Sequence, residues 1–291
     1  MNRRMLRLSG PGSRIAGWTL AALLALAAAI ALSALWPIVL HGVEARAETD
    51  SGDADFNWSW NIAKGKSIEI KGINGGIDVK LASGTETRVT AVKRAHGSDP
   101  DEVTVEFVEH EGGVTVCAIY EKSSKNFCAP GNRSQHIHNR NDTEVRFTVE
   151  VPAGVGFIGN VVNGSVEAEG LKSPVSVHTV NGAVSVSTSD EVTAQTVNGS
   201  IVASMGPGKA SGDLEFATVN GSITLRMPEG FDAQLSASTM NGVIDSDFPV
   251  TVKGTIGRRS LKGTIGSGGR DLSLSTVNGN IRLRTIAAKD I

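Results

Sequence analysis

The chain has 291 residues, a formal net charge of −2 and a sequence pI near 6.3. This weak charge argues against a dedicated nucleic-acid-binding protein, which usually presents a strongly basic face. Charged residues make up 20% of the chain and hydrophobic residues 40%, which excludes a disordered chain. Aromatic residues are only 4%, whereas there are 34 glycines, and this balance is typical of many short strands joined by tight turns.

The chain begins with a basic segment that is followed by a long apolar run. Residues 1–14 contain four arginines and no acidic residue, and residues 15–40 contain no charged residue. At ~1.5 Å per residue, a helix of this length spans the ~30 Å hydrocarbon core of a membrane. Because basic residues precede the run and acidic residues follow it, we expect the N-terminus in the cytoplasm and the rest of the chain outside.

Two interpretations of this N-terminal segment remain open. Ala45-Arg46-Ala47 is a small-x-small site, which indicates a signal peptide that is cleaved after Ala47. The length of the apolar run indicates instead a retained anchor in the inner membrane. We therefore expect residues 1–47 to be a signal peptide or an anchor and residues 48–55 to be a polar linker. Residues 56–291 would then form an extracytoplasmic domain, which is membrane-anchored or, after cleavage, periplasmic or secreted.

Residues 56–155 form the irregular first part of this domain. Short alternating runs in this part predict strands, and two clusters of Asp, Pro and Gly predict turns. The expected strands are 68–70, 77–79, 103–105, 114–116 and 145–151, and the expected turns are 99–101 and 111–113.

Cys117 and Cys128 are the two cysteines of the chain. Outside the cytoplasm, two cysteines at this separation are expected to form a disulfide, because the compartment is oxidising. A pair of buried free thiols is the alternative. A redox-active pair is not expected, since the spacing is not Cys-x-x-Cys.

The part of the sequence from residue 156 to residue 286 is a repeat. The tetrapeptide Thr-Val-Asn-Gly occurs at 179–182, 196–199, 218–221 and 276–279, with variants at 72–75, 161–164 and 239–242. The Asn-to-Asn steps from Asn163 to Asn241 are 18, 17, 22 and 21 residues, and the last step of 37 is interpreted as two units with one degenerate corner. The expected corner residues are Asn74, Gly75, Asn163, Gly164, Asn181, Gly182, Asn198, Gly199, Asn220, Gly221, Asn241, Gly242, Asn278 and Gly279.

The residues that flank the corners alternate between apolar and polar, which predicts strands with one buried face. Asn-Gly indicates a change of direction, because Gly accepts a positive φ and Asn tolerates it. As type I′ turns, the corners would produce stacked β-hairpins that form a sandwich. As corners of a β-solenoid, they would allow one coil to stack on the next around a continuous core. The fixed period favours an all-β solenoid (β-helix-like), preceded by an N-terminal hydrophobic helix.

The solenoid makes a specific prediction about side-chain direction. An apolar residue lies three places after each Asn and should point inward and stack from coil to coil, whereas the next residue should point outward. The inward residues are Val184, Ile201, Ile223 and Ile281, and the outward residues are Ser185, Val202, Thr224 and Arg282.

Four signatures add to these repeats. They are Phe56-Asn57-Trp58-Ser59-Trp60 with Ile73-Asn74-Gly75; Val116-Cys117-Ala118-Ile119-Tyr120 with Cys128-Ala129-Pro130-Gly131; Asn141-Asp142 before Val149-Glu150-Val151-Pro152-Ala153-Gly154-Val155; and Ser260-Leu261-Lys262-Gly263-Thr264-Ile265-Gly266 before Thr276-Val277-Asn278-Gly279. With the repeats, they make residues 56–286 resemble a putative-adhesin domain of unknown function, a β-strand repeat family of bacterial envelope proteins. The resemblance implies an extracytoplasmic β-solenoid-like fold and no established reaction.

Two clusters of side chains were considered as binding sites. His136 and His138 would share one strand face, and His110 with the acidic residues near Asp142 could complete a metal site. A solvated polar loop is the favoured interpretation, since no third ligand lies at a fixed spacing. A basic cluster could contact anionic lipid or glycan, but a solvated face is again favoured. It consists of Arg258, Arg259, Lys262 and Arg270.

The sequence therefore predicts a non-enzymatic envelope protein, a putative adhesin or binding scaffold for an unknown envelope protein or glycan. No catalytic residue, cofactor, metal or nucleic acid is expected, and membrane contact is expected only through residues 15–40 if they are retained. A membrane-tethered sensor or regulatory partner in envelope stress is one alternative. A polysaccharide-active β-helix enzyme is another, although it would need stacked acidic residues where this sequence has mostly Ser and Thr.

Overall fold

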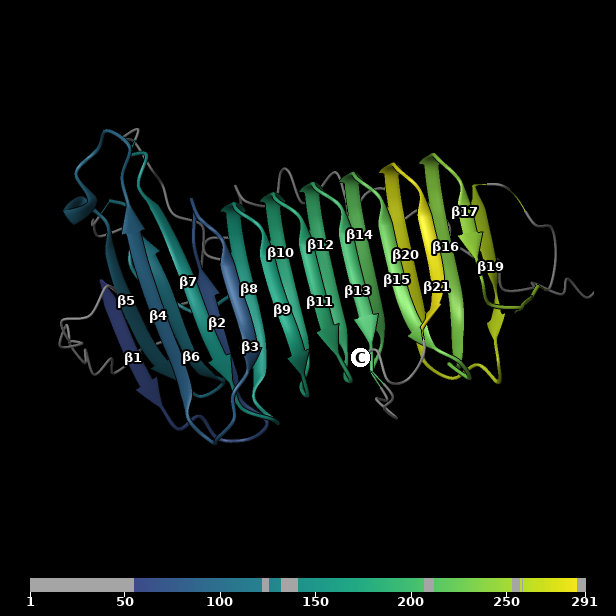
Figure 1. Ribbon diagram of the computed structural model, residues 1–291, viewed down its shortest axis with the longest axis horizontal. Helices are drawn as coiled ribbons and strands as arrows, with labels where there is room; N and C mark the ends of the chain where they lie inside the picture. Colours follow the sequence, from purple (N-terminus) through teal and green to yellow (C-terminus); the bar gives the residue numbers. More distant parts are fainter. Residues whose placement is uncertain are drawn as a thin grey trace, which may run out of the picture. The chain divides into compact units, whose positions relative to one another are not determined.

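The computed structural model describes residues 55–121, 126–131, 141–206, 212–252, 257 and 259–286. These residues form 21 strands in two large, mostly parallel sheets, with one short 3₁₀ helix at Pro100–Glu102 (Figure 1). The fold class of the described residues is therefore all-β, as expected. The expected N-terminal hydrophobic helix falls outside the described residues, and within them no helix is long and apolar enough to cross a membrane.

The two sheets are called sheet A and sheet B. In spatial order, sheet A consists of β1 (Phe56–Trp60), β4 (Thr87–Arg94), β7 (Glu144–Val151), β3 (Ile77–Leu81), β9 (Val166–Leu171), β11 (Val184–Thr188), β13 (Ile201–Met205), β15 (Ile223–Pro228), β21 (Ile281–Ile286) and β17 (Ile244–Ser246). Sheet B consists of β18 (Val250–Thr251), β19 (Ser260–Ile265), β16 (Ala233–Asn241), β20 (Asp271–Asn278), β14 (Leu214–Asn220), β12 (Val192–Asn198), β10 (Val175–Asn181), β8 (Gly156–Asn163), β2 (Ser67–Lys71), β6 (Gly113–Ile119) and β5 (Thr104–His110).

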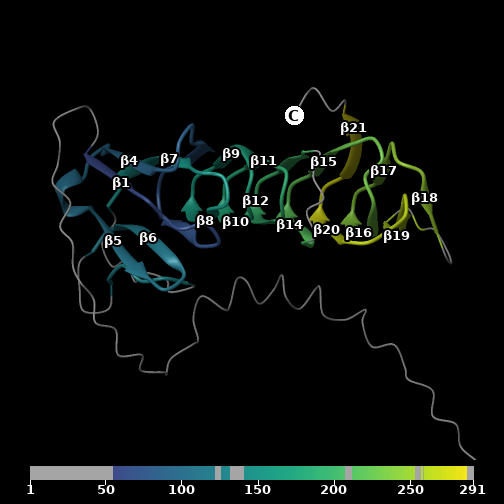
Figure 2. The same cartoon turned by 90° about the horizontal axis from the view of Figure 1, so that it is seen from below.

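The two strands at each Asn-Gly corner lie in different sheets. β10 ends at Asn181 in sheet B, and β11 begins at Val184 in sheet A. Each strand then pairs in parallel with its equivalent in the next coil, β10 with β12 and β11 with β13. The strands from β8 to β15 therefore form a β-solenoid-like stack, and the hairpin alternative does not describe them. Figure 2 shows the two sheets facing each other across the core.

The inner rows of the solenoid confirm the predicted side-chain direction. Val184 pairs in register with Ile201, Ile201 with Ile223, and Ile223 with Ile281, and all four side chains are at most 1% exposed. The residues between them alternate with this row and are half-buried on the outer face of sheet A. The buried row follows from the period of two, because successive side chains of a strand point to opposite faces.

The spatial order of the coils departs from their order in the chain. β14 and β15 pair with β20 and β21, and β16 and β17 lie beyond these. The prediction of a degenerate corner in the 37-residue step is wrong. This part of the chain forms β18 and β19, which pair antiparallel with each other, and β19 also pairs antiparallel with β16. At the other end, β2 and β3 lie between the coil of β8 and β9 and the strands β6 and β7.

The N-terminal end of the solenoid is closed by antiparallel strands. β1 pairs with β4 and β4 with β7 in sheet A, while β5 pairs with β6 in sheet B. Trp58 and Trp60 stack on each other on β1, and Phe107 of β5 packs against Trp58 with ring centroids 5.5 Å apart. These aromatic side chains cover the end of the core. The expected strands 68–70, 77–79, 114–116 and 145–151 lie within β2, β3, β6 and β7, whereas β4 was not predicted.

Candidate functional site

The seven predicted corner asparagines form one ladder of side-chain amides. Six of them donate a hydrogen bond from Nδ2 to the Oδ1 of the neighbouring asparagine at 2.8–2.9 Å, and Asn74 at the end of the ladder accepts one. The spatial order of the ladder is Asn74, Asn163, Asn181, Asn198, Asn220, Asn278 and Asn241. Stacked amide ladders stabilise neighbouring strands in register. The asparagines therefore hold the coils together along one corner of the solenoid.

The corner glycines are required for a different reason from the one predicted. Among them, only Gly75 has a positive φ, of 110°. A Cβ at Gly182 would lie 2.0 Å from the carbonyl oxygen of Gly164, and one at Gly199 would lie 1.9 Å from that of Gly182. The backbones of neighbouring coils thus approach too closely for any side chain. Left-handed backbone is the wrong explanation for these repeated glycines, which instead permit close stacking.

The threonine that begins each Thr-Val-Asn-Gly unit, or the Thr-Met-Asn-Gly variant, is buried and bonded to the neighbouring coil. Its hydroxyl donates to the carbonyl oxygen of the corner glycine one coil away at 2.9 Å. These threonines are Thr179, Thr196, Thr218, Thr239 and Thr276. Thr, Asn and Gly of the repeat therefore all serve the stacking of coils, which makes the corners structural.

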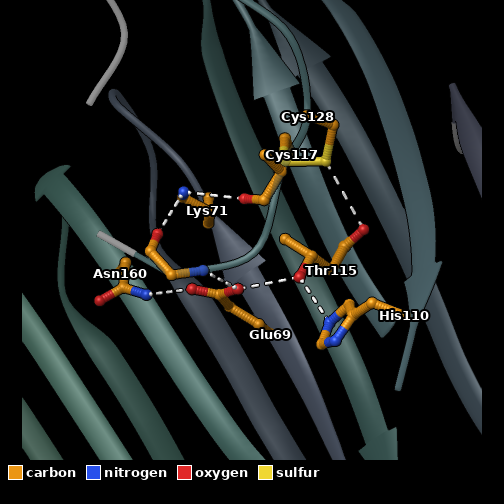
Figure 3. The surroundings of a disulfide bond; sticks show 9 residues. Glu69, Lys71, His110, Thr115, Cys117, Cys128 and Asn160 are labelled. Atoms are coloured by element: carbon orange, nitrogen blue, oxygen red, sulfur yellow. Dashed lines mark hydrogen bonds between the residues drawn. A yellow bond between two sulfur atoms is a disulfide. The ribbon is translucent and has the colours of Figure 1, made fainter. Parts of the chain in front are cut away.

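A second group of polar side chains lies beneath a disulfide-closed loop. Cys117 of β6 and Cys128 are joined by a disulfide, and Lys71 Nζ donates to the carbonyl oxygens of Ala129 at 3.1 Å and Gly131 at 2.7 Å (Figure 3). These contacts hold residues 126–131 against the outer face of sheet B. Formation of the disulfide in the exported protein remains a prediction.

Glu69 is the buried carboxylate under this loop, and it is only 5% exposed. It accepts hydrogen bonds from Thr115 Oγ1 at 2.8 Å, Asn160 Nδ2 at 2.9 Å and the Gly131 amide at 3.1 Å (Figure 3). A buried carboxylate is tolerated when such donors replace its water. The alternation along β2 places Glu69 on the outer face, and the loop then covers it. The sequence could not reveal this burial, because nothing in it places the loop over the strand.

His110, which was considered as a metal ligand, instead joins this hydrogen-bond network through Thr115. Its Nδ1 accepts from the Gly112 amide at 3.2 Å, so its Nε2 faces Thr115 Oγ1, 3.1 Å away, as a donor. Asp142 accepts from the amides of Ser98 and His96, and the bond from Ser98 most strongly lowers the pKa of Asp142. His136 and His138 lie outside the described residues. Within the described ranges, no group of three His, Cys, Asp or Glu side chains is placed to hold a metal.

The predicted basic cluster is only partly described. Arg258 lies outside the described residues, and Lys262 lies in β19, opposite Ser236 of β16. The guanidinium of Arg270 lies 5.2 Å from the ring centroid of Phe231, which is a cation–π contact. Arg270 is therefore engaged with an aromatic ring, which charge pattern alone did not indicate.

The outer face of sheet B carries an in-register row of polar side chains. His178 of β10 pairs with Asn160 of β8 on one side and with Gln195 of β12 on the other. Gln195 Nε2 donates to Oε1 of Glu215 on β14 at 3.0 Å. Around this row, the outward residues are mostly hydroxyls, namely Ser176, Thr193, Ser236, Ser238, Ser273 and Ser275.

His178 is the member of this row with unused hydrogen-bonding capacity. Its Nδ1 is buried and has no hydrogen-bond partner among the described residues. Burial lowers the pKa of His178, although the charge of Glu215 acts in the opposite direction. Burial therefore favours the neutral imidazole, in which one nitrogen is a donor and the other an acceptor. We refer to the in-register residues Asn160, His178 and Gln195, together with Glu215, which lies in register with Thr193 and bonds Gln195, as the polar row. It is the candidate binding site of this fold.

The structure is similar to several solved structures. One is the crystal structure of a putative cell adhesion protein from Clostridium sporogenes ATCC 15579, with 9% sequence identity over 79% of this chain and 99% of that chain and a TM-score of 0.44. Another is a putative adhesin from Bacteroides fragilis NCTC 9343, with 14% identity over 79% of this chain and 96% of that chain and a TM-score of 0.32. No curated protein matches this sequence.

A family model covers the regular coils. It is described as Toastrack DUF4097 and matches residues 159–284, from within β8 to within β21. These residues contain the six corners from Asn163 to Asn278 together with the whole polar row. Over less than half of the chain, this sequence is thus similar to the Toastrack DUF4097 domain, a domain of unknown function.

Proposed function

We propose that this chain is a non-enzymatic, extracytoplasmic binding scaffold that holds an envelope glycan or protein on the outer face of sheet B. The observation that carries the proposal is the polar row, in which the amides of Asn160 and Gln195 flank the imidazole of His178 in register, and the Glu215 carboxylate bonds Gln195 from the next strand. Neighbouring strands are ~4.8 Å apart, so the in-register groups of Asn160, His178 and Gln195 repeat at a fixed interval. Such a row suits a ligand with many hydroxyl or amide groups, and we expect an envelope polysaccharide to be the first class of ligand.

The rigidity of the scaffold supports this role. Every corner is tied to its neighbour by an asparagine and most also by a threonine, and the core is one continuous row of apolar side chains. A binding surface on such a frame loses little conformational entropy when a ligand binds. A polysaccharide-cleaving enzyme would need two carboxylates that flank the bond to be cut. Glu69, the buried carboxylate on this face, is instead sealed by three hydrogen bonds.

Binding to purified envelope polysaccharide tests the proposal. The full chain is mixed with insoluble polysaccharide, and the bound fraction is measured by co-sedimentation. Because His178 and Gln195 each supply a hydrogen bond to the ligand, we expect H178A/Q195A to raise the dissociation constant about tenfold or more.

The matched control is Ser236→Ala, which changes a short polar side chain of the same face on β16, three strands from Gln195 and in a different register row. We expect it to bind as the unmodified chain does. Equal binding by H178A/Q195A, or the absence of binding to both polysaccharide and envelope proteins, would contradict the proposal.

A further inference from the structure

The outer face of sheet A is divided by charge. On β9, Glu167 and Glu169 are both exposed and point to the same side. Three strands away, Arg226 of β15 is exposed, and Arg282 lies on the next strand, β21. Within the described residues, none of these four side chains forms a salt bridge. The face therefore has an acidic half and a basic half whose charges are only partly offset within the chain, since Lys80 lies in register with Glu169 and Asp245 lies in register with Arg282.

Other charged side chains on this face are already neutralised by neighbours. Asp78 bonds Arg146 at 2.7 Å, Lys80 lies 3.0 Å from Glu150, and Arg284 Nη1 lies 3.0 Å from Asp247. Glu167 and Glu169 on one side and Arg226 and Arg282 on the other form no salt bridge within the described residues, so they can pair with a partner.

The strands between the two halves present a flat surface of small side chains. Ser185 of β11 lies in register with Val202 of β13, and Ser187 lies in register with Ser204. No long side chain stands between the acidic and basic halves on these two strands. A second sheet can therefore approach to the ~10 Å at which sheets stack face to face.

The register of the strands matches the acidic half to the basic half under a two-fold axis. Glu167, Ser185, Val202, Thr224 and Arg282 lie in one row across sheet A. Glu169 and Arg226 each lie two residues further along their strands, in the next row. A two-fold axis that is parallel to the strands and passes between β11 and β13 preserves the rows and brings β9 over β15 of a second copy. Glu169 then faces Arg226 of that copy, and Glu167 lies diagonally opposite Arg282.

We propose that the outer face of sheet A is a self-association surface and that its occupant is a second copy of this chain. The symmetric arrangement forms each pair of charges twice, as an isologous dimer requires. Six strands of five or six residues give a face of about 500 Å² per copy, or about 1,000 Å² in total. This area is at the lower end of specific interfaces, so the dimer is weak and its affinity depends on salt.

Charge reversal with mixing tests the proposal. The full chain is purified in mild detergent, and its mass is followed by sedimentation equilibrium at low and high salt. The unmodified chain should dimerise at low salt and dissociate as salt screens the pairs. E167R/E169R and R226E/R282E should each raise the dimer dissociation constant about tenfold or more, because like charges then face each other. An equimolar mixture of the two variants should restore the dimer, since every pair is again of opposite sign.

The control reverses charges on the opposite face of the domain. Asp271→Arg and Lys262→Glu change sheet B and should leave the association constant unchanged. A monomeric unmodified chain at low salt, or a dimer that ignores both reversals, would overturn the proposal. Dimers of each reversed variant alone that match those of the mixture would also overturn it. Because these variants leave the polar row intact, their outcome is independent of ligand binding on sheet B.

Discussion

Three residues of the repeated tetrapeptide each contact the neighbouring coil in a different way. Thr196 donates to the carbonyl oxygen of Gly182 at 2.9 Å, and Asn198 donates to Asn181 at 2.8 Å. Gly199 contributes by having no side chain, because a Cβ at this position would overlap the Gly182 carbonyl oxygen. The tetrapeptide therefore stabilises the stacking of neighbouring coils, and substitution of its glycine should reduce stability the most.

A glycine-to-alanine change at a corner tests this point. In Gly199→Ala, the added Cβ would lie 1.9 Å from a backbone oxygen, which no side-chain movement can relieve. We expect the free energy of unfolding to fall by roughly 2–4 kcal/mol. Chemical denaturation of the purified chain measures it. The matched control is Gly84→Ala, where a Cβ meets nothing within 4 Å and which should change stability by less than about 0.5 kcal/mol. Equal effects would contradict the close-approach argument.

Tyr120 makes the stability of the first corner depend on pH. Its Oη lies 2.8 Å from the carbonyl oxygen of Thr143 and 3.0 Å from that of Asn74, and burial raises the pKa of Tyr120 from 10.0 to about 12. The unfolded chain loses this proton first, so the folded state is favoured fully below pH 10 and loses that advantage as pH rises towards about 12. The loss should reach roughly 2–3 kcal/mol across this window.

Denaturation curves recorded at several alkaline pH values check this expectation. Tyr120→Phe has no phenol to titrate, so its stability should fall less steeply than that of the unmodified chain over the same pH interval. Parallel curves for the two proteins would show that Tyr120 is not the group responsible.

At the scale of the strand, the period of two determines the face and the register. Ile223 lies in the buried row between Ile201 and Ile281, and it is 0% exposed. Thr224, the next residue, points to the outer face of sheet A. A slip of one residue would exchange these two faces and expose the whole apolar row, which is why the register is strongly specified.

Aspartate substitutions distinguish the two faces. Ile223→Asp buries a charge without a partner and should destabilise the fold by several kcal/mol. Thr224→Asp places the same charge at the surface and should cost less than about 1 kcal/mol. Chemical denaturation of both variants compares them directly. Similar losses from the two changes would contradict the assigned inner face.

The same periodicity explains what the sequence could and could not predict. Alternation indicated β2, β3, β6 and β7, and an equivalent alternation at Thr87, Val89 and Ala91 would have revealed β4. The order of the coils was not predictable, because each coil offers nearly the same rows of apolar, Thr and Asn side chains to either neighbour. The coil of β20 and β21 therefore fits between β14–β15 and β16–β17 as well as at the end of the stack.

Contacts between segments that are far apart in the sequence are the second kind of information that local patterns lack. Glu69 was not predicted as a site residue, because its strand alternates normally and only the loop at residues 126–131 buries it. The polar row likewise depends on register between strands that are about 20 residues apart, so His178, Gln195 and Asn160 do not form a motif in the sequence.

At the scale of the whole molecule, two features of the sequence point to the same compartment. Arginines precede the apolar run 15–40 and acidic residues follow it, and on this ground we expect residues 48–291 to be exported. Cys117 and Cys128 are placed for a disulfide that an oxidising compartment would maintain. The state of the two thiols can therefore report where the domain is located.

We expect the disulfide to form in the exported chain and to be absent when export is prevented. In a host that makes the full chain, non-reduced peptides analysed by mass spectrometry should contain the Cys117–Cys128 linkage, whereas a chain without residues 1–47 should be alkylated at both cysteines. A periplasm-dependent reporter fused after Ile291 should be active with the full chain and inactive with the shortened one, because only the basic and apolar N-terminal segment directs export. Alkylation of both cysteines in the full chain without reduction, together with activity of a cytoplasm-dependent reporter alone, would show that the predicted orientation is wrong.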